Sequence, residues 1–310
     1  MISSKKKFLK RIWSGIIISI LSLIIASFLV TKVVYDGIFA RYDIIPDTPF
    51  ALTELVENRQ TVKFESGKNE LNGYIYNADS DGLIILIPGY HASVDEYIWQ
   101  IDALNKKGWA VFCFDPTGSC LSEGDSAVGF SQVIYDLKSA LEFTEQNSRF
   151  GYKDIYLLGH SRGAYAVCSV LADSYDISAA VAVSAVNSSM DAVIQPAESV
   201  VGALAYANYP FLFMYQDSLF GSKVSNVNAA KVINKSDVPV MIVQGSNDEK
   251  YSLDKYSLYS HSFKYSNDNV KYLVCDKAGQ NGHTNLLFDE DGQANEFLID
   301  EIDRFLKANT

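Results

Sequence analysis

Six apolar runs, spread from residue 82 to residue 276, constrain the fold of this chain more than any other feature of its sequence. Each has seven or eight residues, few of them polar, which is typical of strands buried on both faces of a parallel sheet. The runs cover residues 82–89, 109–115, 154–160, 179–186, 238–245 and 270–276. Helix-like segments lie near residues 94–107, 128–146, 162–174, 252–264 and 293–307. Strands alternating with helices predict an α/β fold with helices on both faces of the sheet.

Two segments before these runs have a different pattern. "TVKFES" (61–66) and "LNGYIYNA" (71–78) alternate apolar with polar residues, as a half-buried antiparallel pair does. Two antiparallel strands followed by six parallel ones predict an eight-stranded, mostly parallel sheet. We expect one domain over residues 59–310.

One connection is far longer than the others. About 50 residues, roughly 187–236, separate the fourth run from the fifth, whereas βα loops usually have about 2–6 residues. Its stretch 200–221 is rich in aromatic residues and Met. Two interpretations stay open: a pair of helices that belongs to the core, or a small lid whose apolar face lines a substrate pocket. We predict a helical lid insert over about 187–236.

The amino-terminal segment 12–34 is apolar and carries a single charge, Lys32. About 20 apolar residues suffice for a helix to cross a bilayer. A buried core helix and a cleaved signal peptide are the alternatives, but this segment exceeds the roughly 7–15 apolar residues of a signal peptide and no small-x-small site follows it. We therefore expect an uncleaved transmembrane signal anchor, joined to the domain by a polar connector over residues 35–58.

Charge along the chain predicts its orientation and excludes one class of partner. The first eleven residues carry five Lys or Arg and no acid, so the positive-inside rule places a basic tail, residues 1–11, in the cytoplasm. We expect a single-pass protein of the cell membrane whose domain lies outside the cytoplasm. The net charge of −11 argues against nucleic acid as a partner, because phosphate binding requires a basic surface.

The cysteines show no pattern typical of metal binding. Cys113, Cys168 and Cys275 lie in strand-like or helix-like runs, which favours buried, structural roles, and Cys120 lies outside them. Neither C-x-x-C nor H-E-x-x-H spacing occurs. We expect no metal and no cofactor.

Ser161 is the main candidate for a functional residue. Gly159-His160-Ser161-Arg162-Gly163 fits the pattern G-x-S-x-G between a strand-like run, "IYLL", and a helix-like one, "AYAVCSVLA". A tight turn between a strand and a helix strains the serine backbone and leaves room only for glycine two residues on either side. The helix amino end also favours negative charge near the serine. This context indicates a nucleophile.

With these residues in place, the chain resembles the α/β-hydrolase family over roughly residues 60–308, and most closely its monoacylglycerol-lipase-like and serine-aminopeptidase-like members. "LIPGYHAS" (86–93) resembles the family's oxyanion loop, with Pro88 in place of the usual His. The resemblance implies that the backbone N–H groups of Tyr90 and Arg162 form the oxyanion hole.

A second loop also matches the family. "FDPTGSCLSEG" (114–124) resembles its D-x-R-G-x-G-x-S turn, with Asp115, Gly118 and Ser122 in register. Thr117 stands where Arg is usual and Cys120 where Gly is usual, so the shape of this loop is open to question.

The resemblance further implies a Ser-Asp-His order for a catalytic triad. Asp248 follows the fifth apolar run in a G-x-x-D pattern, and His283 lies in the loop after the last run. His160, His91 and His261 are less suitable because they lie beside the serine, in the oxyanion loop and within a helix-like segment. Asp191 and Asp276 remain rival acids, since each follows a strand-like run.

These residues imply a serine hydrolase that cleaves a carboxylic ester, or a related acyl bond, through an acyl-enzyme. Ser161 attacks, His283 transfers the proton and Asp248 orients the imidazole. The apolar insert suggests an apolar acyl substrate. An aminopeptidase or amidase and an acyltransferase are alternatives with the same triad, and a tethered binding module without turnover is a further one.

Overall fold

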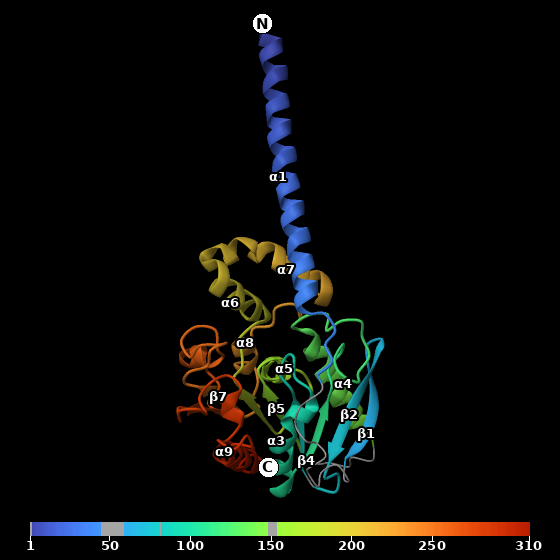
Figure 1. Ribbon diagram of the computed structural model, residues 1–310, viewed down its shortest axis with the longest axis vertical. Helices are drawn as coiled ribbons and strands as arrows, with labels where there is room; N and C mark the ends of the chain where they lie inside the picture. The colour runs from blue at the N-terminus through green and yellow to red at the C-terminus, as the bar shows by residue number, and fades with distance from the viewer. Residues whose placement is uncertain (1, 45–58, 81, 148–153) are drawn as a thin grey trace.

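A single eight-stranded sheet organises the described part of the protein, which in this computed structural model comprises residues 2–44, 59–80, 82–147 and 154–310 (Figure 1). Its strands are β1 (Gln60–Ser66), β2 (Asn69–Tyr76), β3 (Gly82–Ile87), β4 (Ala110–Phe114), β5 (Asp154–His160), β6 (Ala179–Val183), β7 (Val240–Gly245) and β8 (Val270–Cys275). They are ordered β1-β2-β4-β3-β5-β6-β7-β8. β2 pairs antiparallel with both β1 and β4, and all remaining pairs are parallel. The predicted mostly parallel sheet is confirmed.

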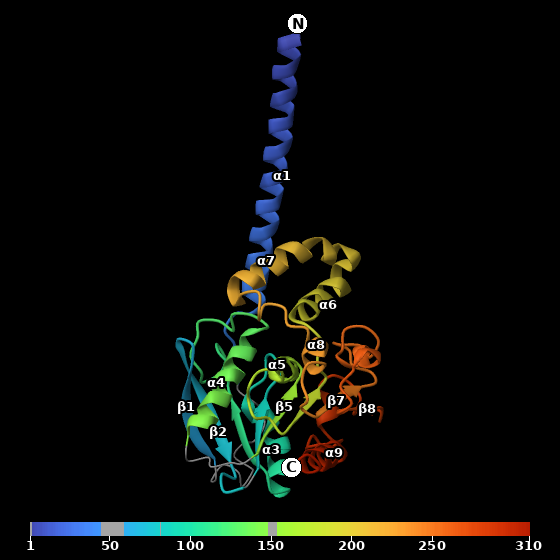
Figure 2. The same cartoon turned by 180° about the vertical axis from the view of Figure 1, so that it is seen from behind.

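Helices cover both faces of this sheet (Figure 2). The α-helices of the described residues, some of which lie beyond the sheet, are α1 (Ile2–Ile38), α3 (Ile98–Lys106), α4 (Gln132–Gln146), α5 (Arg162–Val170), α6 (Ser189–Val201), α7 (Tyr209–Phe220), α8 (Ala229–Ile233) and α9 (Glu296–Lys307). Short 3₁₀ helices are η2 (Val94–Tyr97), η3 (Gly202–Asn208), η4 (Tyr259–Lys264) and η5 (Asn285–Leu287). One apolar cluster joins α4 and α5 to the sheet, and a second joins α3 and α9 to its other face. Alternate side chains of each strand therefore enter different halves of the core.

Most predicted elements are a few residues shorter than expected, and for two of them the structure shows a local cause. β6 ends at Val183 because Ser184 adopts a positive φ of 52°, which leaves the extended conformation. Of the helix expected over residues 252–264, a 3₁₀ turn from Tyr259 to Lys264 is formed. Serine hydroxyls in this segment, Ser257 and Ser260, bond to nearby backbone groups and so compete with helical hydrogen bonding.

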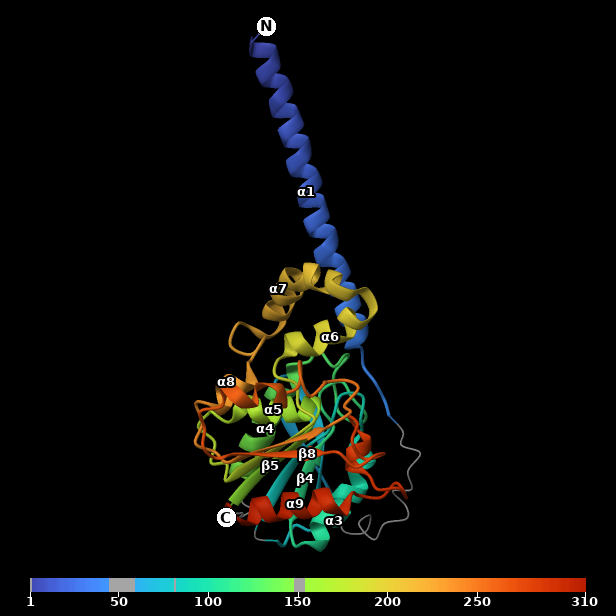
Figure 3. The same ribbon diagram turned by 90° about the vertical axis from the view of Figure 1, so that its left-hand side faces the viewer.

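The long insert folds into α6, η3, α7 and α8. We call residues 189–220, from α6 to α7, the lid, because these elements lie beyond the sheet on the side from which α1 emerges (Figure 3). α8 packs back against α5. The insert is therefore a lid with one short core helix at its end.

α1 is a 37-residue helix that projects away from the domain (Figure 1). Among the described residues it is the one helix long and apolar enough to cross a membrane. Its end differs from the expected polar connector: Tyr35, Phe39 and Tyr42 are buried in the core. Residues 45–58, the rest of that connector, lie outside the described residues. The end of α1 and the residues directly after it are thus packed against the domain, because their aromatic side chains enter the core.

Candidate active site

Ser161 lies on the turn between β5 and α5, in a backbone conformation that few residues other than glycine adopt. Its φ is 55° and its ψ is −115°. A Cβ added to Gly163 would lie 2.2 Å from the carbonyl oxygen of Ile87, and one added to Gly159 would lie 2.4 Å from the carbonyl carbon of Gly163. Both predicted elbow glycines are therefore required by close backbone packing. The strain at Ser161 is the kind that folds retain at functional sites.

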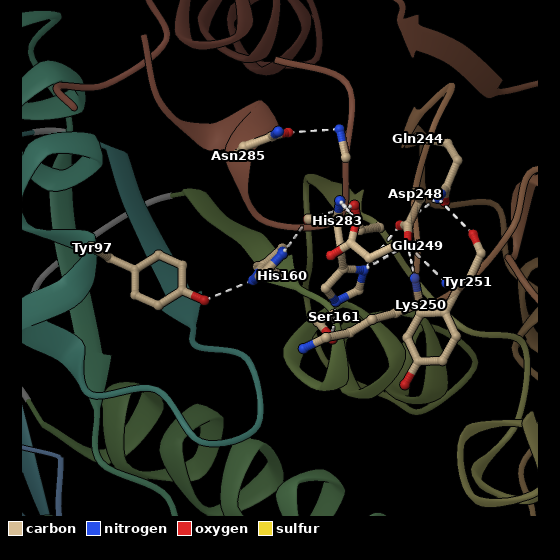
Figure 4. Close-up of polar contacts among 12 residues, drawn as sticks. Tyr97, His160, Ser161, Gln244, Asp248, Glu249, Lys250, Tyr251, His283 and Asn285 are labelled. Carbon is tan, nitrogen blue, oxygen red and sulfur yellow. Dashed lines mark hydrogen bonds and ion pairs between the residues drawn. The ribbon is translucent and has the colours of Figure 1, made fainter. Parts of the chain in front are cut away.

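The structure brings Ser161, His283 and Asp248 together (Figure 4). The Ser161 Oγ lies 2.8 Å from His283 Nε2, and His283 Nδ1 lies 2.9 Å from Asp248 Oδ2. With its Nδ1–H donated to the carboxylate, the imidazole leaves Nε2 free to accept the Ser161 hydroxyl proton. All three side chains are buried. This is the geometry of a nucleophile, a general base and an orienting acid.

The Asp248 carboxylate is held in its ionised form. It accepts backbone N–H bonds from Lys250 at 2.8 Å and Tyr251 at 2.7 Å, and a side-chain bond from Gln244 at 2.7 Å. Burial alone would raise the pKa of Asp248, but the hydrogen bond and charge of His283, together with the backbone N–H groups, lower it below its ordinary value. An ionised carboxylate is the form that stabilises a protonated imidazole.

The two rival acids lie elsewhere. Asp191 accepts a hydrogen bond from the Ser188 hydroxyl, 2.7 Å away, at the start of α6. Asp276 is exposed at the end of β8. The sequence could not separate the three acids, because each follows a strand and the distance to His283 is a property of the fold.

The predicted oxyanion loop lies against the serine. The Gly89 N–H donates to the Tyr97 hydroxyl at 2.9 Å, and a Cβ added to Gly89 would lie 3.5 Å from the Cβ of Ser161. Tyr90 follows directly. Arg162 is the first residue of α5, so its N–H has no acceptor within the helix.

The Arg162 side chain brings a buried positive charge to this side of the site. Its Nε lies 3.3 Å from the carbonyl oxygen of Phe130, and its guanidinium carbon lies 5.3 Å from the centre of the Tyr90 ring. Among the described residues, its two terminal nitrogens have no hydrogen-bond partner. A nearby positive charge favours an oxyanion.

His160 connects the predicted oxyanion loop to His283. Tyr97 donates its hydroxyl proton to His160 Nδ1 at 2.7 Å, and His160 Nε2 donates to the carbonyl oxygen of His283 at 3.0 Å. Burial, and then the charge of His283, lower the pKa of His160 to about 3. His160 is therefore neutral and structural, and its ring points away from the Ser161 hydroxyl.

Two further residues that sequence reasoning missed hold the backbone of His283. Glu249 accepts its N–H at 3.0 Å, and the Ser184 hydroxyl donates to its carbonyl at 3.1 Å. The sequence offered two signals. Ser184 is a polar residue near the end of an apolar run, and Glu249 is an acid next to Asp248. Neither signal identified the partner, since both bonds join segments far apart in sequence.

The loop 114–124, whose shape the sequence left open, is held in place by hydrogen bonds to the rest of the domain. Thr117 donates its hydroxyl to Asp136 at 2.8 Å, a buried partner within the domain. Cys120 adopts a positive φ of 47°, which explains why glycine is usual at that position. The Ser122 hydroxyl accepts the Asn72 N–H at 2.8 Å, so the loop is tied to β2.

Ser161 opens into a cavity of about 840 Å³. Its walls come from the lid, from the end of α1 and from Tyr90, Phe130, Lys250 and Tyr251 of the domain. Among the described residues that line it, none is Asp or Glu, and Lys250 is the one charged residue. Within the described part of the chain, no three His, Cys, Asp or Glu side chains cluster as they would around a metal ion.

Comparisons with known proteins identify a matching family model and similar solved structures. Residues 78–227, just under half of the chain, match the family model described as serine aminopeptidase, S33. No curated protein sequence matches the chain. The solved esterase Pf2001 of Pyrococcus furiosus is similar over 86% of this chain and 97% of its own length, at 22% identity and a TM-score of 0.64.

Two other solved structures share the fold. Est1E of Butyrivibrio proteoclasticus, solved with ferulic acid bound, is similar over 80% of this chain and 98% of its own, at 17% identity and a TM-score of 0.57. An acylaminoacyl peptidase of Pyrococcus horikoshii is similar over 81% of this chain and 41% of its own, at 15% identity and a TM-score of 0.58. The sheet order, the strained serine turn and the likeness to these structures show that this chain has the α/β-hydrolase fold, and its residues 78–227 match the serine aminopeptidase, S33, model.

Proposed function

We propose that this protein is a membrane-anchored serine esterase that cleaves carboxylic esters with an apolar acyl group. The observation that carries the proposal is the Ser161–His283–Asp248 arrangement at the bottom of an apolar cavity. The esterases among the similar structures agree with it.

The geometry supports a two-step mechanism. His283 Nε2 removes the Ser161 proton as Oγ attacks the ester carbonyl, and the N–H groups of Tyr90 and Arg162 stabilise the oxyanion. The protonated imidazole, stabilised by Asp248, then donates its proton to the leaving alkoxide, which departs as an alcohol. Water attacks the acyl-enzyme with His283 again as base, and the acid is released while Ser161 regains its proton.

The lining of the cavity favours esters over peptides with a free amino end. An aminopeptidase binds a positively charged amine, which a carboxylate near the nucleophile would stabilise. The described lining residues include no carboxylate and one cation, Lys250. Apolar side chains make up most of the remaining wall, and these suit an acyl chain.

The membrane location rests on α1. The segment 12–34 is long enough to cross a bilayer, and the Lys and Arg residues before it favour a cytoplasmic amino end. The domain then lies outside the cytoplasm, held close to the membrane surface by the packed end of α1.

The first test is labelling of the full chain with a fluorophosphonate, followed by location of the adduct by mass spectrometry. We expect an adduct on Ser161 and, in parallel, hydrolysis of p-nitrophenyl acetate. Ser161→Ala should lose both, with a rate loss on the order of 10⁴-fold or more. A folded wild-type protein that neither reacts nor hydrolyses the ester would contradict the proposal. Preferred release of an amino-terminal residue from peptides would replace it with an aminopeptidase.

A further inference from the structure

One face of α1 forms a wall of the cavity above Ser161. The residues that line the cavity are Ser27, Thr31, Val34, Tyr35 and Ile38 of α1 and Phe39 directly after it. Spacings of three and four residues place those of α1 on the same side of the helix. From Ser27 to Ile38 this face extends about 17 Å along the helix axis. The segment expected to act only as an anchor therefore contributes a long surface to the substrate site.

The lid is bonded to this end of α1. The Asn208 side-chain amide donates to the Thr31 hydroxyl at 2.8 Å. Lys32 Nζ donates to the Tyr215 hydroxyl at 3.1 Å, and that hydroxyl donates to Asp36. The rings of Phe28 and Tyr215 meet edge to face, with centroids 5.9 Å apart. The anchor and the lid thus enclose the cavity as one unit.

The lid also carries an exposed apolar surface, which we call the docking face: Val200, Leu204, Phe213 and Met214. Leu204 is 75% exposed and Met214 is 58% exposed. No charged residue occurs between residues 199 and 216. An uncharged, apolar exposed face of this kind marks contact with a membrane or with another protein.

The position of the lid along α1 decides whether the docking face contacts a membrane or another protein. A spanning segment of about 20 residues that begins at Ile12 ends near Thr31. Thr31 and Phe28, in the last turns of that segment, are the residues that contact the lid. The lid therefore meets α1 where that helix would leave the bilayer, and the partner of the docking face is the bilayer.

The cavity opens just beyond this level, on the side of the domain. Val34 and Ile38 of α1, and Val201 and Leu204 of the lid, line the cavity and are also exposed. A cavity bounded by exposed residues is open beside them. An acyl chain can thus pass from the bilayer into the cavity along apolar surface without crossing water, which would cost free energy for each exposed methylene.

We propose that the substrate is a lipid ester resident in the bilayer, whose acyl chain lies between the lid and α1, and that α1 selects the length of that chain. This proposal rests on the esterase activity proposed above. α1 is accordingly a specificity-determining part of the enzyme as well as its anchor.

The test uses the full-length protein reconstituted in phosphatidylcholine vesicles, with p-nitrophenyl palmitate in the bilayer and p-nitrophenyl acetate in the water. Val34→Trp fills the cavity at its α1 wall. We expect the ratio of kcat/KM for the palmitate ester to that for the acetate ester to fall at least about tenfold. The control is Val33→Trp, the same substitution one residue away at a side chain that is 71% exposed and lies outside the cavity. Its ratio should stay at the wild-type value.

A second pair of variants tests the docking face. Phe213→Glu places a charge on that face without touching the cavity wall, whereas Phe297→Glu places one on α9, at the far end of the domain (Figure 1). We expect Phe213→Glu to lower the palmitate-to-acetate ratio in vesicles by about tenfold, because a charge enters the membrane poorly, and Phe297→Glu to leave it unchanged.

The outcomes separate this proposal from the esterase proposal. Wild-type protein that fails to hydrolyse the acetate ester contradicts the esterase function itself. Hydrolysis of acetate with equal ratios for Val34→Trp and Val33→Trp overturns the role of α1 in chain selection. Equal ratios for Phe213→Glu and Phe297→Glu overturn membrane docking of the lid. If Val34→Trp does not fold, Ile38→Trp on the same wall makes the same comparison.

Discussion

At the scale of single residues, the geometry of the site depends on the groups that hold His283 as much as on Ser161 and Asp248. The backbone of His283 is bonded at its N–H by Glu249 and at its carbonyl by His160 and Ser184. The same His160 receives the Tyr97 hydroxyl that accepts the Gly89 N–H of the oxyanion loop. The base and the oxyanion loop are therefore fixed relative to each other by a neutral histidine.

The buried state of His160 predicts how stability depends on pH. Its pKa is about 3 in the folded protein and near 6.5 when the chain is unfolded, so the unfolded state binds the extra proton between these values. The free energy of unfolding should fall as the pH drops below about 6.5. Between about pH 5 and 6 the wild-type slope should exceed that of His160→Gln by about 1 kcal/mol per pH unit.

Urea unfolding of the full chain in detergent at several pH values measures this slope. The variants are compared by slope and not by absolute stability, because His160→Gln also changes hydrogen bonds at every pH. Equal slopes would show that another group binds the proton.

At the scale of elements, the turn between β5 and α5 is set by contacts between backbones. Gly163 packs against the carbonyls of Ile87 and Pro88 at the end of β3, so the serine turn and the start of the oxyanion loop are in direct contact. This contact explains why the motif has glycine at position 163. The helix and strand preferences of amino acids do not explain it.

Gly163→Ala should therefore destabilise the protein by about 3 kcal/mol or more, since the added methyl meets a backbone oxygen at 2.2 Å. Thermal unfolding in detergent and fluorophosphonate labelling report stability and the site separately. Gly37→Ala is the matched control: a Cβ there meets nothing within 4 Å, and alanine favours the helix by up to about 1 kcal/mol. A Gly163→Ala protein as stable as Gly37→Ala would disprove the packing argument.

At the scale of the whole molecule, the end of α1 and the domain share a core. Phe39 is buried with Tyr35 in the cluster that includes strands of the sheet, and its ring lies 5.1 Å from that of Tyr90 in the oxyanion loop. The Tyr90 hydroxyl donates to the carbonyl of Ile38. Movement of the anchor would thus reach the oxyanion loop.

Phe39→Ala should lower the free energy of unfolding by about 3–5 kcal/mol, because it leaves a cavity in this shared core. Phe8→Ala, on the exposed part of α1, should leave it unchanged. Chemical unfolding monitored by circular dichroism compares the two variants in detergent. Equal stabilities would mean that the domain folds without the end of α1.

The sequence alone determined the sheet and the elbow, and its motifs indicated the residues that meet in the site while leaving two rival acids open. Continuous apolar runs specify buried parallel strands, and the glycines around Ser161 specify a tight turn, because both features are local. The order of the motifs also indicated Asp248 and His283. What remained open was which of three acids lies beside His283, since that distance depends on how the strands are ordered.

Only the tertiary structure decided what surrounds the triad. Glu249, Ser184 and His160 contact His283 across separations in the chain that no local pattern encodes. The sequence after residue 34 predicted a polar connector, because its aromatic residues are mixed with charged ones such as Asp36 and Arg41. In the fold they complete a core and a cavity wall, since burial depends on which surfaces meet and not on the segment by itself.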